Sequence, residues 1–198
     1  FEVGGIEVVE RDDLGPEQWT KLLVNLNNAV SALSDVSTGT LLLSQDLNRM
    51  AFEALHKDRD QFVRDGMDMA LCTLDQERLV LDYAGANCPL YLVRDGEVLQ
   101  YTPDKMPIGG FELQGKAFTD HRIQLRKNDM VYIFSDGYAD QFGGPRGKKF
   151  LYRRFRELLV EIHGLPLERQ KIMLLEALNQ WKGAHEQVDD ILVIGMRA

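Results

Sequence analysis

The chain has 198 residues, a length typical of one domain with a full hydrophobic core. Hydrophobic residues make up 44% and charged residues 27%, values that exclude a disordered or fibrous protein. The formal net charge of -8 leaves no excess of cations to neutralise a phosphate backbone, so composition argues against nucleic-acid binding. We therefore expect one folded, soluble domain over residues 1–198.

The sequence contains few features that indicate a cellular compartment. No run approaches the roughly 18 apolar residues of a membrane span, so we expect no membrane contact by this chain. Cys72 and Cys88 are too few for a disulfide framework and form no CxxC pair, which favours buried thiols in the reducing cytoplasm. The start at Phe1 has neither a basic leader nor an initiating Met, so we expect a piece of a longer protein, such as the cytoplasmic output domain of a sensor.

The first part of the chain is predicted to form two helices. Pro16 suits the first helical position, and apolar residues recur at three- and four-residue spacing over 19–33, which predicts a helix over 16–34. A second apolar stripe covers 43–55. Two successive helices indicate a layer that covers a sheet.

From Met67 the pattern changes to short strand-like runs joined by tight turns, and strands joined so tightly are mainly antiparallel. Asp95-Gly96 is a strong two-residue hairpin signal. Helical spacing then returns twice, and an apolar strand closes the chain. The expected strands are 69–74, 79–84, 90–93, 98–101, 121–125, 130–135 and 191–196, and the expected helices are 152–162 and 166–181.

This order predicts an α+β fold, a sandwich of mainly antiparallel sheets flanked by helices. Regular alternation of strands and helices is missing from the pattern, which argues against a doubly wound fold.

Two acidic positions stand where a strand begins or ends. Asp136 follows the apolar run 130–134 and precedes Gly137, which lets backbone approach closely. Asp189 and Asp190 directly precede the last apolar strand. Carboxylate oxygens in such places are the ligands that Mg²⁺ and Mn²⁺ prefer. Asp-Gly is also common turn chemistry, so a plain turn stays open as the alternative.

Five motifs follow one another along the chain, and their combination is far more specific than any one of them. They are Asp65-Gly66-Met67-Asp68-Met69-Ala70-Leu71-Cys72, Tyr83-Ala84-Gly85-Ala86-Asn87-Cys88-Pro89-Leu90-Tyr91-Leu92, Lys105-Met106-Pro107-Ile108-Gly109, Phe134-Ser135-Asp136-Gly137-Tyr138-Ala139-Asp140-Gln141-Phe142-Gly143-Gly144 and Val188-Asp189-Asp190-Ile191. In this order they resemble the SpoIIE-type bacterial protein serine/threonine phosphatase domain of the metal-dependent PPM superfamily, from about residue 40 to the C-terminus.

The resemblance implies packed antiparallel sheets flanked by helices, which agrees with the fold expected above. It implies hydrolysis of phosphoserine or phosphothreonine at a centre of two Mn²⁺ or Mg²⁺ ions by metal-activated water, with no catalytic side chain beyond the metal ligands. On the matching motifs, Asp136 and Asp189 are metal ligands, while Gly137 and Asp190 support them. Related proteins often act on a small anti-sigma-factor antagonist, so the expected partner is a phosphoprotein of bacterial signalling.

Two N-terminal metal motifs of the family are not intact. Ile6 and Glu7 follow Gly4-Gly5 where an Asp and an aromatic residue are expected, and Pro16-Glu17 replaces the His-Gly expected after Asp12-Asp13-Leu14-Gly15. Asp12 is the remaining candidate ligand there, with a solvated helix N-terminus as its alternative.

Three interpretations therefore stay open. The chain is an enzyme that lacks its N-terminal strands, or it is a catalytically impaired module that binds or sequesters a signalling partner. The third is a homodimer formed through the predicted helix at 19–33.

The glycine-rich segment 143–149 follows Asp136 and carries cations suited to a phosphoprotein's charge, namely Arg146, Lys148 and Lys149. A solvated loop is the ordinary alternative. The four histidines show no metal-ligand spacing and are expected at the surface or in hydrogen bonds. They are His56, His121, His163 and His185.

Overall fold

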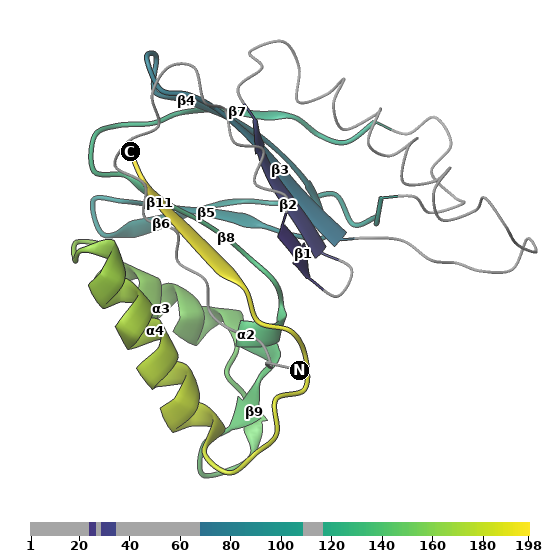
Figure 1. Cartoon of the computed structure of the whole chain (residues 1–198), viewed down its shortest axis with the longest axis vertical. Coiled ribbons are helices and arrows are strands. Elements are labelled where there is room, and N and C mark those ends of the chain that lie inside the picture. Colours follow the sequence, from purple (N-terminus) through teal and green to yellow (C-terminus); the bar gives the residue numbers. More distant parts are fainter. Residues whose placement is uncertain (1–23, 27–28, 35–67, 109–116) are drawn as a thin grey trace, which may run out of the picture. The chain divides into compact units, whose positions relative to one another are not determined.

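A computed structural model describes residues 24–26, 29–34, 68–108 and 117–198 (Figure 1). These residues fall into two compact units. The C-terminal unit contains 91–100 and 127–198, and the N-terminal unit contains the other described residues. The single domain over 1–198 stays a prediction.

The N-terminal unit is built on a five-stranded sheet in the order β1-β2-β3-β4-β7. The β2–β3 pair is parallel, and the other three neighbouring pairs are antiparallel. The mainly antiparallel arrangement predicted for the meander is thus confirmed. The strands are β1 (Val24–Leu26), β2 (Ala29–Ser34), β3 (Asp68–Asp75), β4 (Val80–Ala86) and β7 (His121–Gln124).

The helix predicted over 16–34 is wrong wherever the structure describes that stretch, because both described segments are strands. The main chain of β2 pairs with β3 from Ala29 opposite Asp68 to Ser34 opposite Thr73. Side-chain spacing in a short apolar run cannot reveal a partner strand so far along the chain. The proposed helical dimer contact over 19–33 loses its basis there. The rest of 16–34 and the helix predicted over 43–55 lie outside the described residues.

The interior of the N-terminal unit lies along β3 and β4. Both cysteines are buried and free, as expected. Burial raises the pKa of the Cys72 thiol to about 12, so that thiol stays protonated near neutral pH. The hydroxyl of Tyr83 donates to the carbonyl oxygen of Cys88 at 2.5 Å. Apolar packing is provided by Met69, Leu71, Ala84, Ala86, Ile108 and Phe118.

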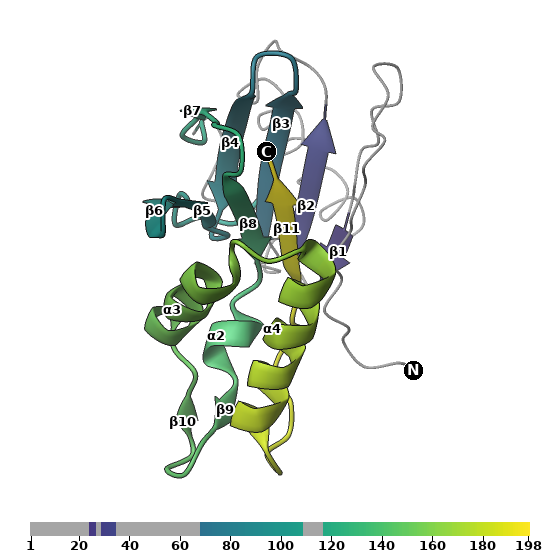
Figure 2. The ribbon, with the colours of Figure 1, turned by 90° about the vertical axis from the view of Figure 1, so that its left-hand side faces the viewer.

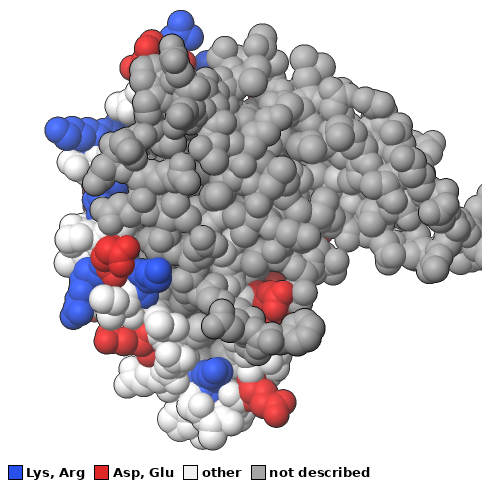
Figure 3. All heavy atoms as spheres, viewed as in Figure 1, with Lys and Arg blue, Asp and Glu red and all other residues white. Residues whose placement is uncertain are grey.

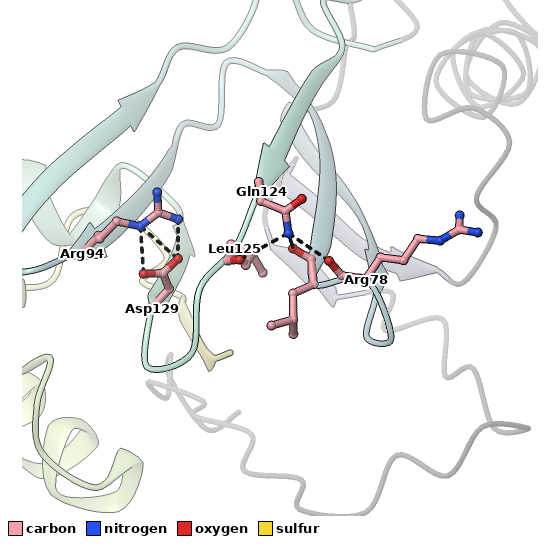
Figure 4. Close-up of polar contacts among 6 residues, drawn as sticks. Arg78, Arg94, Gln124, Leu125 and Asp129 are labelled. Carbon is pink, nitrogen blue, oxygen red and sulfur yellow. Dashed lines mark hydrogen bonds and ion pairs between the residues drawn. The ribbon is translucent and has the colours of Figure 1, made fainter.

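One side chain ties the end of β7 to the turn before β4. Gln124 Nε2 donates to the carbonyl oxygens of Arg78 at 2.9 Å and Leu79 at 3.1 Å (Figure 4). The main-chain N–H of Leu125 also donates to the Leu79 carbonyl at 2.7 Å. These bonds satisfy turn carbonyls that the sheet itself leaves unpaired.

The C-terminal unit has a four-stranded sheet in the order β11-β8-β5-β6 and a two-stranded β9–β10 hairpin. The Asp95-Gly96 hairpin between β5 and β6 is confirmed, with φ of 52° and 78°. The predicted C-terminal helices are confirmed as well. The elements are β5 (Leu90–Arg94), β6 (Glu97–Tyr101), β8 (Met130–Phe134), α2 (Gly137–Asp140), β9 (Phe142–Gly143), β10 (Lys148–Lys149), α3 (Tyr152–Ile162), α4 (Leu167–Lys182) and β11 (Val193–Arg197).

Within this unit α3 and α4 pack on one face of the sheet, as Figures 1 and 2 show. Phe134 on β8 and Phe155 on α3 meet edge to face with ring centroids 4.8 Å apart. The ring centroid of Tyr138 on α2 lies 4.6 Å from that of Phe155. The strand that leads to Asp136 is therefore anchored in an aromatic core.

A buried ion pair closes the opposite end of the sheet. Arg94 at the end of β5 donates through Nε and Nη2 to the carboxylate of Asp129, with Nη2 2.5 Å from Oδ2 (Figure 4). Asp129 is 3% exposed at its side chain, so this fork of hydrogen bonds lies largely out of water. The main-chain carbonyl of Asp129 accepts from the N–H of Ala198 at 3.0 Å.

Among the described residues, no helix is long and apolar enough to cross a membrane.

Candidate functional site

Asp136 lies at the junction between β8 and the short helix α2. Its main chain has φ -69° and ψ -20°, and its carbonyl oxygen accepts from the N–H of Asp140 at 2.9 Å. The residue itself is exposed, although β8 before it is fully buried. The sequence prediction of a carboxylate at the mouth of a buried strand is thus confirmed as a placement.

Gly137 allows close contact between this junction and the chain before β11. A Cβ added to Gly137 would lie 2.3 Å from the carbonyl oxygen of Asp190, a distance that real Cβ atoms do not reach. Only glycine therefore fits without moving one backbone against the other. The two acidic segments singled out in the sequence meet at this contact.

Ser135 joins the same two segments by hydrogen bonds. Its hydroxyl donates to the carbonyl oxygen of Asp190 at 2.8 Å and accepts from the N–H of Leu192 at 3.0 Å. Its own N–H donates to the Leu192 carbonyl at 3.1 Å, which extends the β8–β11 pairing by one step. Sequence reasoning missed this residue, since a serine after an apolar run gives no signal of the chain that it will meet.

Gln141 holds the loop before Asp189 from the other side of α2. Its side chain is fully buried, and Nε2 donates to the carbonyl oxygens of Phe142 at 3.0 Å and Glu186 at 2.9 Å. Its own carbonyl oxygen accepts from Trp181 Nε1 at 3.1 Å. Sequence reasoning missed Gln141 too, because a glutamine between an acid and an aromatic residue is typical of any exposed turn.

The α2 helix between these two contacts is itself anchored. The hydroxyl of Tyr138 donates to the carbonyl oxygen of Leu174 on α4 at 2.7 Å. Burial raises the pKa of the Tyr138 phenol above its ordinary value, so the hydroxyl stays a donor. The segment that carries Asp136 is consequently fixed to β8, to α4 and to the loop before β11.

Asp189 lies in that loop and is exposed. Its Oδ1 accepts from the N–H of Asp190 at 2.8 Å, and its carbonyl oxygen accepts from Gln187 Nε2 at 2.8 Å. The loop is thus held at Glu186 by Gln141 and at Asp190 by Ser135. The tertiary structure brings the segments of Asp136 and Asp189 together, although 52 residues separate them in the sequence.

The donor set suits a hard divalent cation in kind. Asp136 and Asp189 are exposed carboxylates on adjoining segments, and Gly137 lets a backbone carbonyl approach the same place. Within residues 68–108 and 117–198, however, no group of three His, Cys, Asp or Glu side chains could hold a metal ion. Further ligands would have to come from elsewhere in the chain. The candidate Asp12 lies outside the described residues.

The described histidines lie at the surface or in hydrogen bonds, as expected. His121 Nε2 is 3.3 Å from the Thr102 carbonyl oxygen, and His163 Nδ1 is 2.5 Å from that of Val160. His185 is exposed, and His56 lies outside the described part. Part of the predicted loop at 143–149 is the β9–β10 hairpin, with Lys148 opposite Gly143.

Comparison with known proteins agrees with this geometry. The sequence profile of the family described as Stage II sporulation protein E (SpoIIE) matches residues 22–198. No curated protein matches the chain by sequence.

Several solved structures resemble the chain. The SiaA-PP2C domain of Pseudomonas aeruginosa is 28% identical, with a TM-score of 0.63 over 79% of this chain and 68% of that one. The RsbU and RsbW domains of Rv1364c from Mycobacterium tuberculosis are 20% identical, with a TM-score of 0.61 over 81% of this chain and 42% of that one. The PP2C phosphatase domain of SpoIIE from Bacillus subtilis, solved with a fragment of its regulatory domain, is 15% identical. Its TM-score is 0.56 over 79% of this chain and 50% of that one.

The chain thus spans half or less of two of these three relatives and about two thirds of the SiaA domain. The relatives of lower identity support the fold, and the family profile covers most of the chain. The mixed architecture of antiparallel sheets and helices predicted from the sequence is confirmed by these PP2C folds. The chain belongs to the SpoIIE family and is a PP2C-like phosphatase domain of the PPM superfamily.

Proposed function

We propose that this domain is a metal-dependent protein phosphatase that hydrolyses phosphoserine or phosphothreonine in a bacterial signalling protein. Family membership and the 28% identity to the SiaA-PP2C domain support the reaction class. The observation that carries the proposal is the contact between the Asp136 and Asp189 segments, made by Ser135 and Gly137 against Asp190.

In the proposed site Asp136 and Asp189 would hold Mn²⁺ or Mg²⁺, and Asp12 is the candidate for a further ligand. When bound, the cations would lower the pKa of water and neutralise charge on the phosphoryl oxygens. Two carboxylates alone would repel a phosphate ester, which is why a counter-charge is needed beside them. Exposure of both acids keeps this place open to a protein substrate.

Gly137, Ser135 and Gln141 would position the segments that carry the two acidic residues. Gly137 lets the Asp190 carbonyl approach, and Ser135 and Gln141 each fix one end of the Asp189 loop. Ligands held in this way need little reorganisation when they bind a cation. Asp190 contributes through its main chain, which receives the Ser135 hydrogen bond.

The proposed substrate is a phosphoprotein such as a small anti-sigma-factor antagonist, and the proposed compartment is the cytoplasm. Support comes from the family and from the Rv1364c structure, in which RsbU and RsbW domains occur in one protein.

Calorimetric titration with Mn²⁺, paired with hydrolysis of p-nitrophenyl phosphate, tests the proposal. We expect saturable binding and turnover in the unchanged chain, and at least about tenfold weaker binding in Asp136→Asn. Glu176→Gln, which removes an exposed acid from α4, should behave as the unchanged chain. Absence of binding and turnover would contradict metal-dependent hydrolysis by this chain and favour the partner-binding alternative.

A further inference from the structure

One short segment of this acidic chain is rich in cations. Of the 23 Lys and Arg residues, six lie within residues 146–156, where there is no acid. On the face drawn in Figure 3, the blue and red side chains of the described residues are interspersed. The six are Arg146, Lys148, Lys149, Arg153, Arg154 and Arg156.

The β9–β10 hairpin that begins this run is fixed beside the Asp189 loop. The N–H of Gly144 donates to the Trp181 carbonyl oxygen at 2.7 Å, and a Cβ on Gly147 would lie 3.6 Å from the His185 ring. The guanidinium of Arg154 lies 4.5 Å from the centre of the Trp181 ring. The hairpin, α3 and the end of α4 thus meet at Trp181, and Lys149 links the hairpin to Asp140 at the end of α2.

Partners within the chain neutralise only part of this charge. Lys149 Nζ is 2.7 Å from Asp140 Oδ2, and Arg153 forms a longer, exposed pair with Glu157 at 3.7 Å. Arg146 and Lys148 are exposed and form no ion pair with any residue that the structure describes. An exposed ion pair such as Arg153–Glu157 contributes roughly 1 kcal/mol or less to stability. Fold stability therefore does not account for the whole cluster.

Exposed apolar side chains lie among the cations. Phe142 is 39% exposed, and its ring centre is 6.0 Å from Lys149 Nζ. Leu151, between β10 and α3, is 53% exposed and has a φ of 76°. Cations around an exposed aromatic and aliphatic pair are typical of a protein interface, in which apolar residues anchor and charges steer. A polyanion without apolar groups would not use Phe142 and Leu151.

We propose that Phe142, Arg146, Lys148, Lys149, Leu151, Arg153 and Arg154 form a docking surface for an acidic segment that flanks the phosphorylated residue of a protein substrate. This inference rests on the proposed function, because it concerns how the same domain would recognise a phosphoprotein substrate. The surface raises the local concentration of acidic substrates that the net charge of -8 would otherwise repel. Specificity then comes from sequence around the phosphoserine.

Fluorescence anisotropy with two labelled phosphoserine peptides tests the docking surface. One peptide carries glutamates on both sides of the phosphoserine, and the other carries glutamines there. At low ionic strength we expect the glutamate peptide to bind the full chain about tenfold more tightly, and salt to abolish the difference. Arg146→Glu with Lys148→Glu should bring the two affinities together, and the neutral pair Arg146→Gln with Lys148→Gln should give an intermediate loss.

The matched control is Lys127→Glu with Arg169→Glu, which makes the same change in net charge at exposed positions elsewhere. It should keep the preference for the glutamate peptide. Equal affinities in the unchanged chain, or the same loss in this control, would overturn the docking surface. Displacement of the glutamate peptide by a single-stranded oligonucleotide at lower concentration would overturn its assignment to a protein.

Hydrolysis of p-nitrophenyl phosphate by the unchanged chain separates the two proposals. Turnover without peptide preference would sink the docking surface and leave the proposed function standing. Peptide preference without turnover would contradict the proposed hydrolysis and leave only the binding of acidic peptides to this surface.

Discussion

The Ser135 hydroxyl donates to the Asp190 carbonyl oxygen at 2.8 Å, and this bond joins the two acidic segments of the candidate site. The same hydroxyl accepts from the N–H of Leu192, so one side chain satisfies a donor and an acceptor of the neighbouring chain. Ser135→Ala deprives the partly buried Asp190 carbonyl and the buried Leu192 N–H of this hydroxyl partner. We expect a loss of about 1–3 kcal/mol in urea unfolding and weaker Mn²⁺ binding by calorimetry. Unchanged Mn²⁺ affinity would show that this bond serves the fold alone.

Gly137→Ala should disturb the site more than its size suggests. The new Cβ would meet the Asp190 carbonyl oxygen at 2.3 Å, so one backbone must shift, at about 1–3 kcal/mol. Gly164→Ala is the matched control, because nothing lies within 4 Å of its added Cβ, and it should change stability by less than about 0.5 kcal/mol. Equal effects of the two changes in urea unfolding and Mn²⁺ titration would contradict the close contact.

Gln141→Ala should loosen the loop before Asp189. The change leaves the carbonyl oxygens of Glu186 and Phe142 without their buried donor, for which we expect a cost of about 1–3 kcal/mol. Hydrogen exchange should accelerate selectively over 183–190, and Mn²⁺ affinity should fall with it. Gln180→Ala on the exposed side of α4 is the control. Faster exchange throughout the C-terminal unit would instead indicate a general loss of packing.

Arg94→Met should be among the most destabilising single changes in the C-terminal unit. It leaves the Asp129 carboxylate buried without its fork of hydrogen bonds, for a cost of about 3–5 kcal/mol. Arg153→Met removes an exposed pair with Glu157 and should cost less than about 1 kcal/mol. Thermal and urea unfolding compare the two variants. A small effect at Arg94 would mean that water reaches Asp129 when the arginine is removed.

Asp120 should make stability depend on pH in an unusual direction. Asp120 is an exposed residue, but partial desolvation of its carboxyl, and then the charge of Asp82, raise the pKa of that carboxyl. The folded state therefore holds this proton more tightly than the unfolded chain, and stability falls as pH rises from the unfolded pKa through the folded pKa. Asp120→Asn should be more stable than the unchanged chain near neutral pH and lose that advantage below the ordinary carboxyl range. A melting-temperature difference that does not vary with pH would contradict this.

Local pattern was sufficient for much of the C-terminal part of the fold. Helix α3 begins and ends where its apolar spacing predicts, at Tyr152 and Ile162, and the Asp95-Gly96 turn adopts the positive φ values that its residues favour. These features depend on neighbours in sequence, namely side chains one helical turn apart or two adjacent turn residues. Asp136 and Asp189 also stood out from the sequence alone, because an acid beside a buried strand contrasts with its neighbours.

Long-range pairing could not be seen in the same way. Residues 29–34 suit a helix by spacing, yet they form β2 because β3 offers a parallel partner from Asp68 to Thr73. Main-chain hydrogen bonds between distant segments override a weak local preference. The β9–β10 hairpin likewise depends on contacts with Trp181, which cannot be predicted from the residues of the hairpin itself.

The family, the two acidic positions and the cations of the 143–149 segment could be predicted without a structure, because each is a property of residue types in order. The structure was needed to show that Asp136 and Asp189 lie on adjoining segments and that Ser135 and Gln141 hold these segments. Those contacts join residues about fifty positions apart, and they exist only after the β8–β11 pair and the helices have packed. The physical reason is that hydrogen bonds and close backbone contacts depend on distance in space, whereas residue patterns record only distance along the chain.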